Sequence, residues 1–261
     1  MSEPANQYSR RFGGIARLYG EAGLDALRHS RVCVVGVGGV GSWAVEALAR
    51  SGVGALTLVD LDNVAPSNTN RQLHALSADF GKPKVRALSE RIAGINPECA
   101  VSEIEDFVSE DNLDEIFRLP FDFVIDAIDQ VRVKAAMAAR FVALGQPFVV
   151  SGGAGGQRNP ALIGRADLAA VTHDALLSNM RYTLRRRYGF SRDPKRKLGV
   201  PCVYSTEQPL MPERESASCD AAPQGLSCAG YGASMLVTAP FGLFCAQAAV
   251  EHIVRTGAKA A

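Results

Sequence analysis

The sequence predicts an α/β fold with a doubly wound, mostly parallel sheet of the Rossmann type, preceded by a helical N-terminal arm and followed by a C-terminal excursion. Three observations predict this fold. Short apolar runs rich in β-branched residues alternate with segments of helical periodicity. The first apolar run ends in clustered glycines and leads at once into a helical segment, which is the order strand, tight turn, helix. No linker-like tract divides the chain, so we expect one domain over residues 1–261.

The N-terminal elements can be justified one by one. The helical arm at residues 1–30 is expected in two pieces, the first with Phe12 and Ile15 on one face. Strands at residues 31–37 and 55–60 enclose the glycine turn and its helix. The second of these strands ends in an acid, so a polar group is expected at its carboxyl end.

The following elements continue the alternation. A polar loop at residues 62–72 precedes a helix at residues 84–95, in which Val85 and Leu88 recur at helical spacing and which stops before Pro97. Right-handed crossovers are expected between the parallel strands. The remaining elements expected in this part are a strand at 100–104, a short helix at 111–117, a strand at 121–126, a helix at 131–144, and strands at 147–151 and 161–167.

The single domain is expected to have four parts. These are the arm at residues 1–30, a core at 31–170, a basic and irregular segment at 171–228, and a C-terminal helix at 229–261. The third part begins with a helix at residues 174–188. Residues 190–228 show little periodicity and are expected to be irregular.

Composition excludes several classes of function. A formal net charge of +1 gives no global attraction to nucleic acid or to an anionic membrane, so such a partner requires a local patch. The six cysteines form no C-x-x-C pair, which argues against a zinc framework and against a disulfide scaffold. The polar N-terminus lacks the apolar core of a signal peptide. We therefore expect a cytoplasmic protein with reduced thiols.

One long segment complicates that expectation. Residues 221–250 contain no charged residue and are long enough to span a bilayer. Several glycines, two prolines and two glutamines lower the apolar density of the segment. We expect a buried C-terminal helix, and membrane association through these residues is the less favoured alternative.

The glycine turn indicates a nucleotide site. Gly36, Gly38 and Gly41 fit the dinucleotide fingerprint, and Asp60 stands nineteen residues after Gly41, where an acid binds a ribose. Glycines let the backbone approach a phosphate, and the start of the helix attracts it with free N–H groups and a partial positive charge. Taken alone, this pattern favours NAD or FAD and therefore an oxidoreductase.

Four other side chains favour ATP over a dinucleotide. Arg71 and Lys84 are cations suited to the charge that develops when a triphosphate is broken between its α and β phosphates. Asp129, beyond the fourth strand, is suited to Mg²⁺, and Asn68 shares the polar loop with Arg71. Each could be a solvated polar residue by itself, but together they predict ATP and Mg²⁺ as ligands. A bound monovalent cation is left open.

These residues lie in motifs that resemble the ubiquitin-activating-type adenylating enzymes. The motifs are, in order, GVGGVGS at residues 36–42, LVDLDNV at 58–64, SNTNRQ at 67–72, GKPK at 81–84 and DAID at 126–129. In that family such residues contact ATP: the glycines approach it, the acid of the second motif binds the ribose, and the loop residues and lysine bind the phosphates. The resemblance implies a nucleotide site formed by Gly36, Gly38, Gly39, Gly41, Asp60, Asp62, Asn68, Arg71, Lys84 and Asp129.

The resemblance extends to the N-terminus and to the quaternary structure. The stretch YSRR at residues 8–11 resembles an N-terminal arginine motif that reaches into the ATP site of a partner subunit. Arg10 is the better match and Arg11 is the alternative. A homodimer is therefore implied, in which Asp129 of one chain would hold Mg²⁺ at the α-phosphate.

A local basic patch lies in the third part of the chain. The patch contains eight basic residues and one acid, Asp193, and aromatic residues lie between the basic ones. Cations neutralise phosphates and aromatic rings stack on unpaired bases, so the patch predicts binding of RNA, with a solvated helix end as the alternative. The basic residues are Arg181, Arg185, Arg186, Arg187, Arg192, Lys195, Arg196 and Lys197.

Together with LGVPCVYSTE at residues 198–207, this patch is similar to the tRNA threonylcarbamoyladenosine dehydratases. The resemblance covers essentially the whole chain. It implies that ATP activates the threonyl carboxylate of N6-threonylcarbamoyladenosine beside the anticodon, and that ring closure then expels AMP, a net dehydration. Catalysis would involve Arg10, Arg71, Lys84 and Asp129, and the glycine loop at residues 152–156 would admit the anticodon loop.

Several alternatives stay open beside this interpretation. Adenylation of a sulfur-carrier protein is disfavoured because the chain lacks the two C-x-x-C pairs that hold zinc in such activators. An NAD-dependent oxidoreductase or a non-catalytic RNA-binding protein would use only part of the pattern. Cys228 stands where related enzymes carry a reactive thiol, although ring closure needs none. Contact with a sulfur-transfer protein is the other role that the resemblance implies for it.

Overall fold

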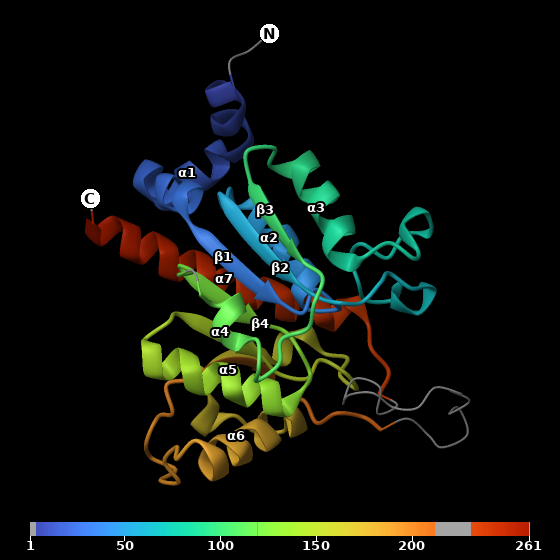
Figure 1. The fold of residues 1–261 in the computed structure, drawn as a ribbon, viewed down its shortest axis with the longest axis vertical. Coiled ribbons are helices and arrows are strands. Elements are labelled where there is room, and N and C mark those ends of the chain that lie inside the picture. The colour runs from blue at the N-terminus through green and yellow to red at the C-terminus, as the bar shows by residue number, and fades with distance from the viewer. Residues whose placement is uncertain (1–3, 119, 212–230, 261) are drawn as a thin grey trace.

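The computed structural model describes residues 4–118, 120–211 and 231–260. Its strands are β1 (Arg31–Val35), β2 (Ala55–Val59), β3 (Ala100–Ile104), β4 (Phe123–Asp126), β5 (Phe148–Ser151), β6 (Ile163–Asp167) and β7 (Pro201–Ser205). Within the described residues they form one seven-stranded sheet of order β3-β2-β1-β4-β5-β7-β6 (Figure 1). The chain winds outward from β1 in both directions, so the predicted doubly wound α/β fold is confirmed.

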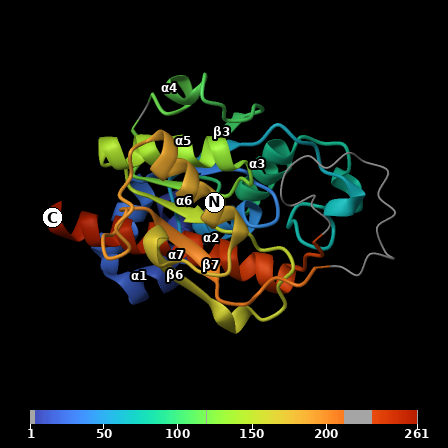
Figure 2. The ribbon, with the colours of Figure 1, turned by 90° about the horizontal axis from the view of Figure 1, so that it is seen from below.

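Helices cover both faces of the sheet (Figures 1 and 2). They are α1 (Pro4–His29), α2 (Gly41–Arg50), α3 (Lys84–Ile95), α4 (Leu113–Ile116), α5 (Val131–Leu144), α6 (Ala175–Arg187) and α7 (Met235–Ala260). Alternating residues of β1 show how the layers divide, because successive side chains of a strand face opposite sides. Val32 and Val34 are buried in a cluster with α2, α3 and α7. Cys33 and Val35 are buried in a second cluster with α5 and α6.

The register of the sheet aligns the ends of its central strands. β1 runs parallel to β2 and to β4, and Val35 pairs with both Val59 and Asp126. The carboxyl ends of these three strands therefore lie at one level. The loops that follow them meet at this edge, which is where open α/β sheets bind ligands.

Most expected elements are present close to their predicted bounds. α3, β3 and α5 begin and end at the predicted residues, and the other core elements differ by one or two residues at an end. The arm is also in two pieces as predicted, because Gly20 interrupts α1 with φ 79° and ψ 163°. Tyr8 fixes the first piece to the body of the protein by donating a hydrogen bond to the carbonyl of Gly52 at 2.6 Å. Burial raises the pKa of Tyr8 to about 12.

The expectation that residues 190–228 are irregular is wrong for β7. This strand lies between β5 and β6, parallel to the first and antiparallel to the second. Cys202 and Val203 are fully buried in it. Pro201 suggests the absence of a strand, although the first residue of a strand tolerates proline.

The apolar C-terminal segment forms α7, which packs against α2 and α1. Residues Met235–Gly257 are long and apolar enough to cross a membrane. The most apolar stretch of 18 residues within them has a mean hydropathy of 1.3 and is 56% buried inside the protein. A Cβ on Gly242 would stand 2.4 Å from the carbonyl oxygen of Val40, so α7 crosses the start of α2 in close contact. This packing is that of a core helix.

Candidate functional site

The glycine turn joins β1 to α2 at the carboxyl edge of the sheet. Gly36 has a φ of 80°, which favours glycine, and its N–H donates to the carbonyl of Val59 at 2.8 Å. A Cβ on Gly41 would stand 1.9 Å from the carbonyl oxygen of Gly36, so no side chain fits there. The turn leads into the N-terminus of α2, where Ser42 donates its N–H to the carbonyl of Gly38, and Ala44 donates to that of Val40. The positive end of the helix dipole there attracts an anion.

Asp60 fastens the end of β2 to this turn. Its Oδ2 accepts the N–H of Val37 at 2.8 Å, and its Oδ1 accepts the N–H of Asp62 at 3.0 Å. Burial raises the pKa of Asp60, and the ammonium group of Lys84 opposes that rise. The structure thus places the predicted ribose-binding acid beside the glycine turn.

Lys84 is a buried cation at the same edge. Only 6% of its side chain is exposed, and its Nζ lies 2.6 Å from Oδ2 of Asp62 and 3.7 Å from Oδ1 of Asp60. α3 begins at this residue, directly after Pro83, so the helix start fixes where the side chain emerges. Two carboxylates offset the positive charge of this buried ammonium group, and a phosphate can interact with the same charge.

Arg71 and Asn68 lie in the loop between β2 and α3. Asn68 is buried, and its Oδ1 accepts a backbone N–H three residues earlier at 3.0 Å. The stem of Arg71 lies against the turn, with Cγ 3.3 Å from the position of a Cβ on Gly39. Its guanidinium donates to the carbonyl of Ser67 at 2.8 Å and to Oδ1 of Asn70 at 2.9 Å. The loop therefore holds a cation over the glycines.

The start of α7 anchors this loop from the other side. Asn70 donates from Nδ2 to the carbonyl of Ala233 at 2.7 Å, and the N–H of Met235 donates to the carbonyl of Asn70 at 3.0 Å. Trp43 of α2 donates from Nε1 to the carbonyl of Arg71 at 2.9 Å. Segments far apart in the sequence thus fix the backbone that carries Arg71.

Sequence reasoning missed two buried polar residues in this loop. Gln72 is 7% exposed, and its Nε2 lies 3.6 Å from the position of a Cβ on Gly38, so its amide faces the turn. His74 is 2% exposed, and neither of its ring nitrogens has a partner in the part of the chain that the structure describes. Burial, and next the charge of Lys84, lower the pKa of His74 to about 4. A polar run in a loop gives no sign that such side chains are buried.

The two acids of DAID have different roles. Asp126 ends β4, is 1% exposed, and pairs through Oδ1 with the Nζ of Lys134 at 2.7 Å. Burial raises the pKa of Asp126, and Lys134 opposes the rise. Asp129 is half-buried, three residues further along, in the loop before α5. This loop touches the glycine turn, because a Cβ on Gly36 would stand 3.0 Å from the backbone of Ala127.

The predicted glycine loop at residues 152–156 follows β5 at the same edge. Gly153 donates its N–H to Oδ2 of Asp174 at 2.9 Å, and Oδ1 of Asp174 caps α6 by accepting the N–H of Leu177. A Cβ on Gly152 would stand 2.1 Å from that carboxylate. The loop and the start of α6 are therefore one packed unit.

The two N-terminal arginines differ in their surroundings. Arg11 donates from Nη1 to the carbonyls of Gly94 and Ile95, at 3.2 and 2.9 Å, and so satisfies the last turn of α3. Arg10 is exposed on α1. Between the two, Arg10 is the one whose side chain is available to another subunit.

Some basic residues of this segment are held by hydrogen bonds, others are exposed to solvent, and Arg187 is both. Arg181 donates to the carbonyls of Leu168 and Val171, and Arg185 donates to the carbonyl of Ser191. Arg187 donates to both carboxylate oxygens of Glu110, at 2.9 and 3.0 Å. The exposed basic residues are Arg186, Arg187, Arg192, Lys195, Arg196 and Lys197.

The cysteines of the described residues offer no activated thiol. Burial raises the pKa of Cys33, Cys202 and Cys245, which disfavours the reactive thiolate. Cys228 lies outside the described residues. Within the described ranges no group of three His, Cys, Asp or Glu side chains could hold a metal ion.

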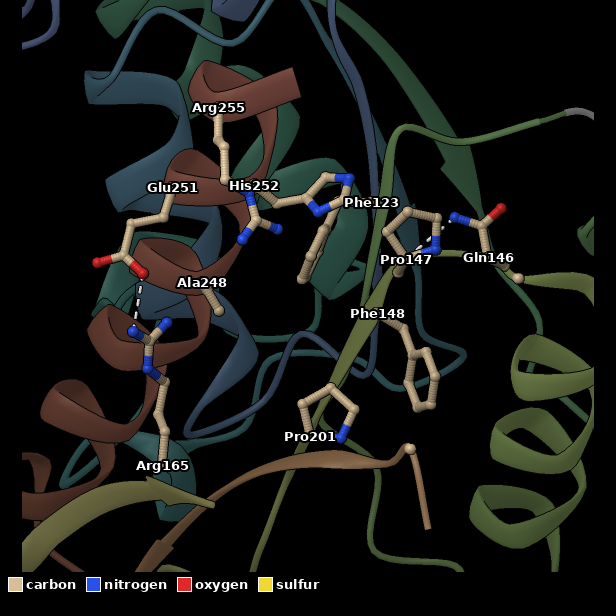
Figure 3. A pocket seen from close by; sticks show the side chains of 12 residues that line it. Phe123, Gln146, Pro147, Phe148, Arg165, Pro201, Ala248, Glu251, His252 and Arg255 are labelled. Carbon is tan, nitrogen blue, oxygen red and sulfur yellow. Dashed lines mark hydrogen bonds and ion pairs between the residues drawn. The ribbon is translucent and has the colours of Figure 1, made fainter. Parts of the chain in front are cut away.

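A cavity of about 650 Å³ lies elsewhere (Figure 3). Phe123 and Phe148, which line it, are the first residues of β4 and β5, so the cavity opens at the amino edge of the sheet. Arg165 from β6 and Glu251 from α7 pair across its rim at 2.7 Å. The glycine turn lies at the opposite, carboxyl edge of the sheet. Open α/β sheets bind ligands at that edge, so we place the candidate site at the turn.

Comparison with known proteins agrees with the geometry. Residues 8–259 match the family model of the ThiF family. The chain is 44% identical over 261 residues to the tRNA threonylcarbamoyladenosine dehydratase of Escherichia coli strain K12, and the match covers 98% of this chain and 97% of that protein. A crystal structure of the E. coli tRNA N6-threonylcarbamoyladenosine dehydratase in complex with ATP has a TM-score of 0.89 at 43% identity and 99% coverage of both chains. The E. coli molybdopterin-synthase adenylyltransferase is 36% identical over 57% of this chain and 60% of its own length.

Proposed function

Because the chain belongs to the ThiF family, we propose that it dehydrates N6-threonylcarbamoyladenosine in tRNA to the cyclic form, with ATP as the activating substrate. The observation that carries this proposal is the 44% identity to the E. coli dehydratase over 98% of the chain. That match includes both the glycine turn and the basic segment. The match to the molybdopterin-synthase adenylyltransferase covers only 57% of the chain. This is what we expect if the two proteins have only the nucleotide-binding core in common.

The first chemical step forms an acyl-adenylate. A threonyl carboxylate oxygen attacks the α-phosphorus of ATP, and pyrophosphate leaves with the electrons of the broken P–O bond. This step needs positioning and charge neutralisation, and no covalent bond to the enzyme. Lys84 and Arg71 provide positive charge on two sides of the glycine turn, and the N-terminus of α2 provides the positive end of a helix dipole.

The second step closes the ring. The carbamoyl group of the same nucleoside attacks the activated carbonyl, loses a proton, and AMP leaves. One oxygen of the threonyl carboxylate leaves as part of AMP, and the carbamoyl group has lost a proton, so the nucleoside has lost the elements of water. Tethering of the nucleophile gives a high effective molarity, so the main tasks of the protein are to adenylate and to exclude bulk water.

Mg²⁺ fits Asp129, the acid in the loop that follows β4. Mg²⁺ is commonly held by one or two carboxylates together with substrate phosphates, so a cage of protein ligands is not required. Asp129 is half-buried in the loop that touches the glycine turn. Asp126 forms a buried ion pair with Lys134, so we assign it a structural role. The bound ion would offset negative charge on the phosphates, and Asp129 would hold it in place.

A homodimer completes the site in this proposal. Arg11 is used within its own chain, and the exposed Arg10 is the residue we assign to the ATP site of a second copy. The anticodon loop of the tRNA would enter over residues 152–156 and the exposed part of the basic segment. We place the reaction in the cytoplasm, where tRNA is modified.

Mass spectrometry of nucleosides tests the reaction directly. The protein is incubated with ATP, Mg²⁺ and threonylcarbamoylated tRNA, and the tRNA is then digested. We expect the modified nucleoside to lose the mass of one water only when ATP is present. An unchanged nucleoside under conditions in which the protein binds ATP would contradict the proposal.

Three further measurements separate the alternatives. ATP–pyrophosphate exchange that proceeds without tRNA, driven by a small protein ending in Gly-Gly, would indicate a sulfur-carrier activator. Thermal stabilisation by NADH but not by ATP with Mg²⁺ would indicate an oxidoreductase. Binding of tRNA that ignores both ATP and the change Asp129→Ala would indicate a non-catalytic RNA-binding protein.

A further inference from the structure

A cluster of charges joins the first turn of α5 to the last turn of α6. Glu110, in the loop before α4, lies 3.3 Å from the guanidinium of Arg132 and accepts two hydrogen bonds from Arg187. The guanidinium groups of Arg187 and Arg132 lower the pKa of Glu110, so this acid is ionised at neutral pH. The three residues are far apart in the sequence, and only the fold brings them together.

The cluster borders a cavity of about 390 Å³. Its lining residues are Arg132, Tyr182, Thr183, Arg186 and Arg187. The ring of Tyr182 is largely in solvent, with 61% of the residue exposed, and Arg186 donates from Nη1 to its hydroxyl at 3.3 Å. Three guanidinium groups line the cavity and one carboxylate borders it, so the charge at the cavity is positive.

The side chains of the cavity differ in how firmly they are held. Glu110 fixes Arg187 by two parallel hydrogen bonds, which makes this arginine part of the frame. Arg132 is 74% exposed in its side chain, and Arg186 is also exposed. Two exposed cations, Arg132 and Arg186, thus line the cavity together with the exposed ring of Tyr182.

This combination fits one unpaired nucleotide. An aromatic ring stacks on a base of any sequence, and adjacent guanidinium groups bind the phosphates on either side. An acidic peptide would use the cations but would gain nothing from an exposed ring. The ring therefore favours RNA over an acidic protein partner.

The position of the cavity relates it to the nucleotide site. Arg132 is the second residue of α5 and comes three residues after Asp129, so the cavity lies at the same end of α5 as the glycine turn. We propose that Arg132, Tyr182 and Arg186 form a subsite for an unpaired nucleotide that neighbours the adenosine being dehydrated. This proposal rests on the proposed function, because it takes the tRNA loop as the occupant.

Binding of an anticodon stem–loop RNA tests the subsite. The full-length protein is titrated into fluorescein-labelled RNA at several salt concentrations, and a second RNA series carries 2-aminopurine at successive loop positions. We expect Tyr182→Ala to weaken binding about tenfold and to abolish 2-aminopurine quenching at one loop position, whereas Tyr182→Phe keeps both. We expect the double variant Arg132→Ala/Arg186→Ala to lower the slope of log K against log salt by about 1.4, since each phosphate on a single strand contributes about 0.7.

The matched control removes two exposed arginines elsewhere. Arg17→Ala/Arg50→Ala takes two positive charges from α1 and α2, and we expect it to leave the salt slope and the quenching unchanged. Equal losses in the control and in the cavity variant would show a general charge effect and overturn the subsite. Competition by polyglutamate that is insensitive to Tyr182→Ala would likewise overturn it in favour of an acidic protein.

Failure of the subsite can be told apart from failure of the proposed function. If the wild-type protein dehydrates modified tRNA while the cavity variants bind RNA normally, only the subsite is wrong. If the wild-type protein does not dehydrate the tRNA at all, the proposed function is wrong. Thermal unfolding of each variant shows that a loss of binding does not come from a loss of fold.

Discussion

The ammonium group of Lys134 lies 2.7 Å from Oδ1 of Asp126, and both side chains are shielded from solvent, with 0% and 1% exposure. This ion pair sits where β4 ends, and Asp126 also accepts the N–H of Ile128 at 3.2 Å. The pair therefore shapes the loop that leads to Asp129. The first acid of the DAID motif is therefore structural, and the second, Asp129, is the one that we assign to Mg²⁺.

Removing one partner of this pair should be costly. Lys134→Met leaves a carboxylate buried without its cation, and we expect the free energy of unfolding to fall by about 3–5 kcal/mol. Urea denaturation measures the change. The double variant Lys134→Met/Asp126→Asn removes both charges and keeps an acceptor for Ile128, so it should recover most of the loss. A single variant as stable as the wild type would show that the pair does not hold the end of β4.

Lys84 should matter to the chemistry far more than its neighbour Lys82. Lys84 is buried beside Asp60 and Asp62 at the glycine turn, whereas Lys82 makes surface ion pairs with Asp79 and Glu90. We expect Lys84→Met to lower tRNA-dependent ATP–pyrophosphate exchange by about 100-fold to 1,000-fold, the usual effect of losing one group that stabilises developing charge.

The matched control for this prediction is Lys82→Met. It removes the same charge two residues away, and we expect exchange within about threefold of the wild type because exposed ion pairs contribute little. Circular dichroism of both variants checks that they are folded. Comparable losses for the two lysines would mean that the buried position of Lys84 has no special role.

The glycines of the turn should separate into structural and ligand-facing positions. A Cβ on Gly41 would clash with the carbonyl of Gly36 at 1.9 Å, while a Cβ on Gly38 would meet nothing closer than Gln72 Nε2 at 3.6 Å. We expect Gly41→Ala to lower the free energy of unfolding by about 2–3 kcal/mol through overpacking. Gly38→Ala should unfold like the wild type but raise the KM for ATP about tenfold, because its methyl group occupies the approach of a phosphate.

Thermal unfolding and ATP titration of the two alanine variants decide this point. The prediction depends on the difference between them, so each serves as the control of the other. Unchanged ATP affinity in Gly38→Ala would mean that the phosphates do not pass over Gly38. An undisturbed fold in Gly41→Ala would contradict the close contact between Gly41 and Gly36.

Local patterns were sufficient to predict the layered fold and the position of the nucleotide edge. Apolar periodicity identifies strands and helices of the core, and their alternation dictates a parallel sheet whose strand ends meet. Lys84 and Asp60 could be predicted to share that edge because each stands at the boundary of such an element. The roles of these residues toward ATP stay predictions.

The parts that could not be predicted depend on contacts across long stretches of sequence. β7 begins at a proline, and it is recognisable only from its pairing with β5 and β6. Glu110 and Arg187 pair across 77 positions, so no local charge pattern reveals which arginines of the basic segment are anchored. The burial of His74 in a polar loop is of the same kind, since it follows from packing around the start of α3.

His74 should make the stability of the protein depend on pH. Burial and the charge of Lys84 lower its pKa from 6.5 to about 4, so between these values the unfolded chain binds a proton that the folded protein does not. The folded state is therefore favoured above pH 6.5 and loses stability as the pH falls toward 4. A gap of about 2.5 between the two pKa values corresponds to about 3 kcal/mol at most.

The variant His74→Leu isolates this contribution. Neither ring nitrogen has a partner in the described structure, so leucine breaks no hydrogen bond and should change the free energy of unfolding at pH 7 by less than about 1 kcal/mol. Urea denaturation from pH 4.5 to 7 should then show a smaller loss of stability on acidification than in the wild type. The control is His29→Ala, which removes an exposed histidine of α1 and so shows whether losing any histidine changes the profile. Identical pH profiles for His74→Leu and the wild type would show that folding does not lower the pKa of His74.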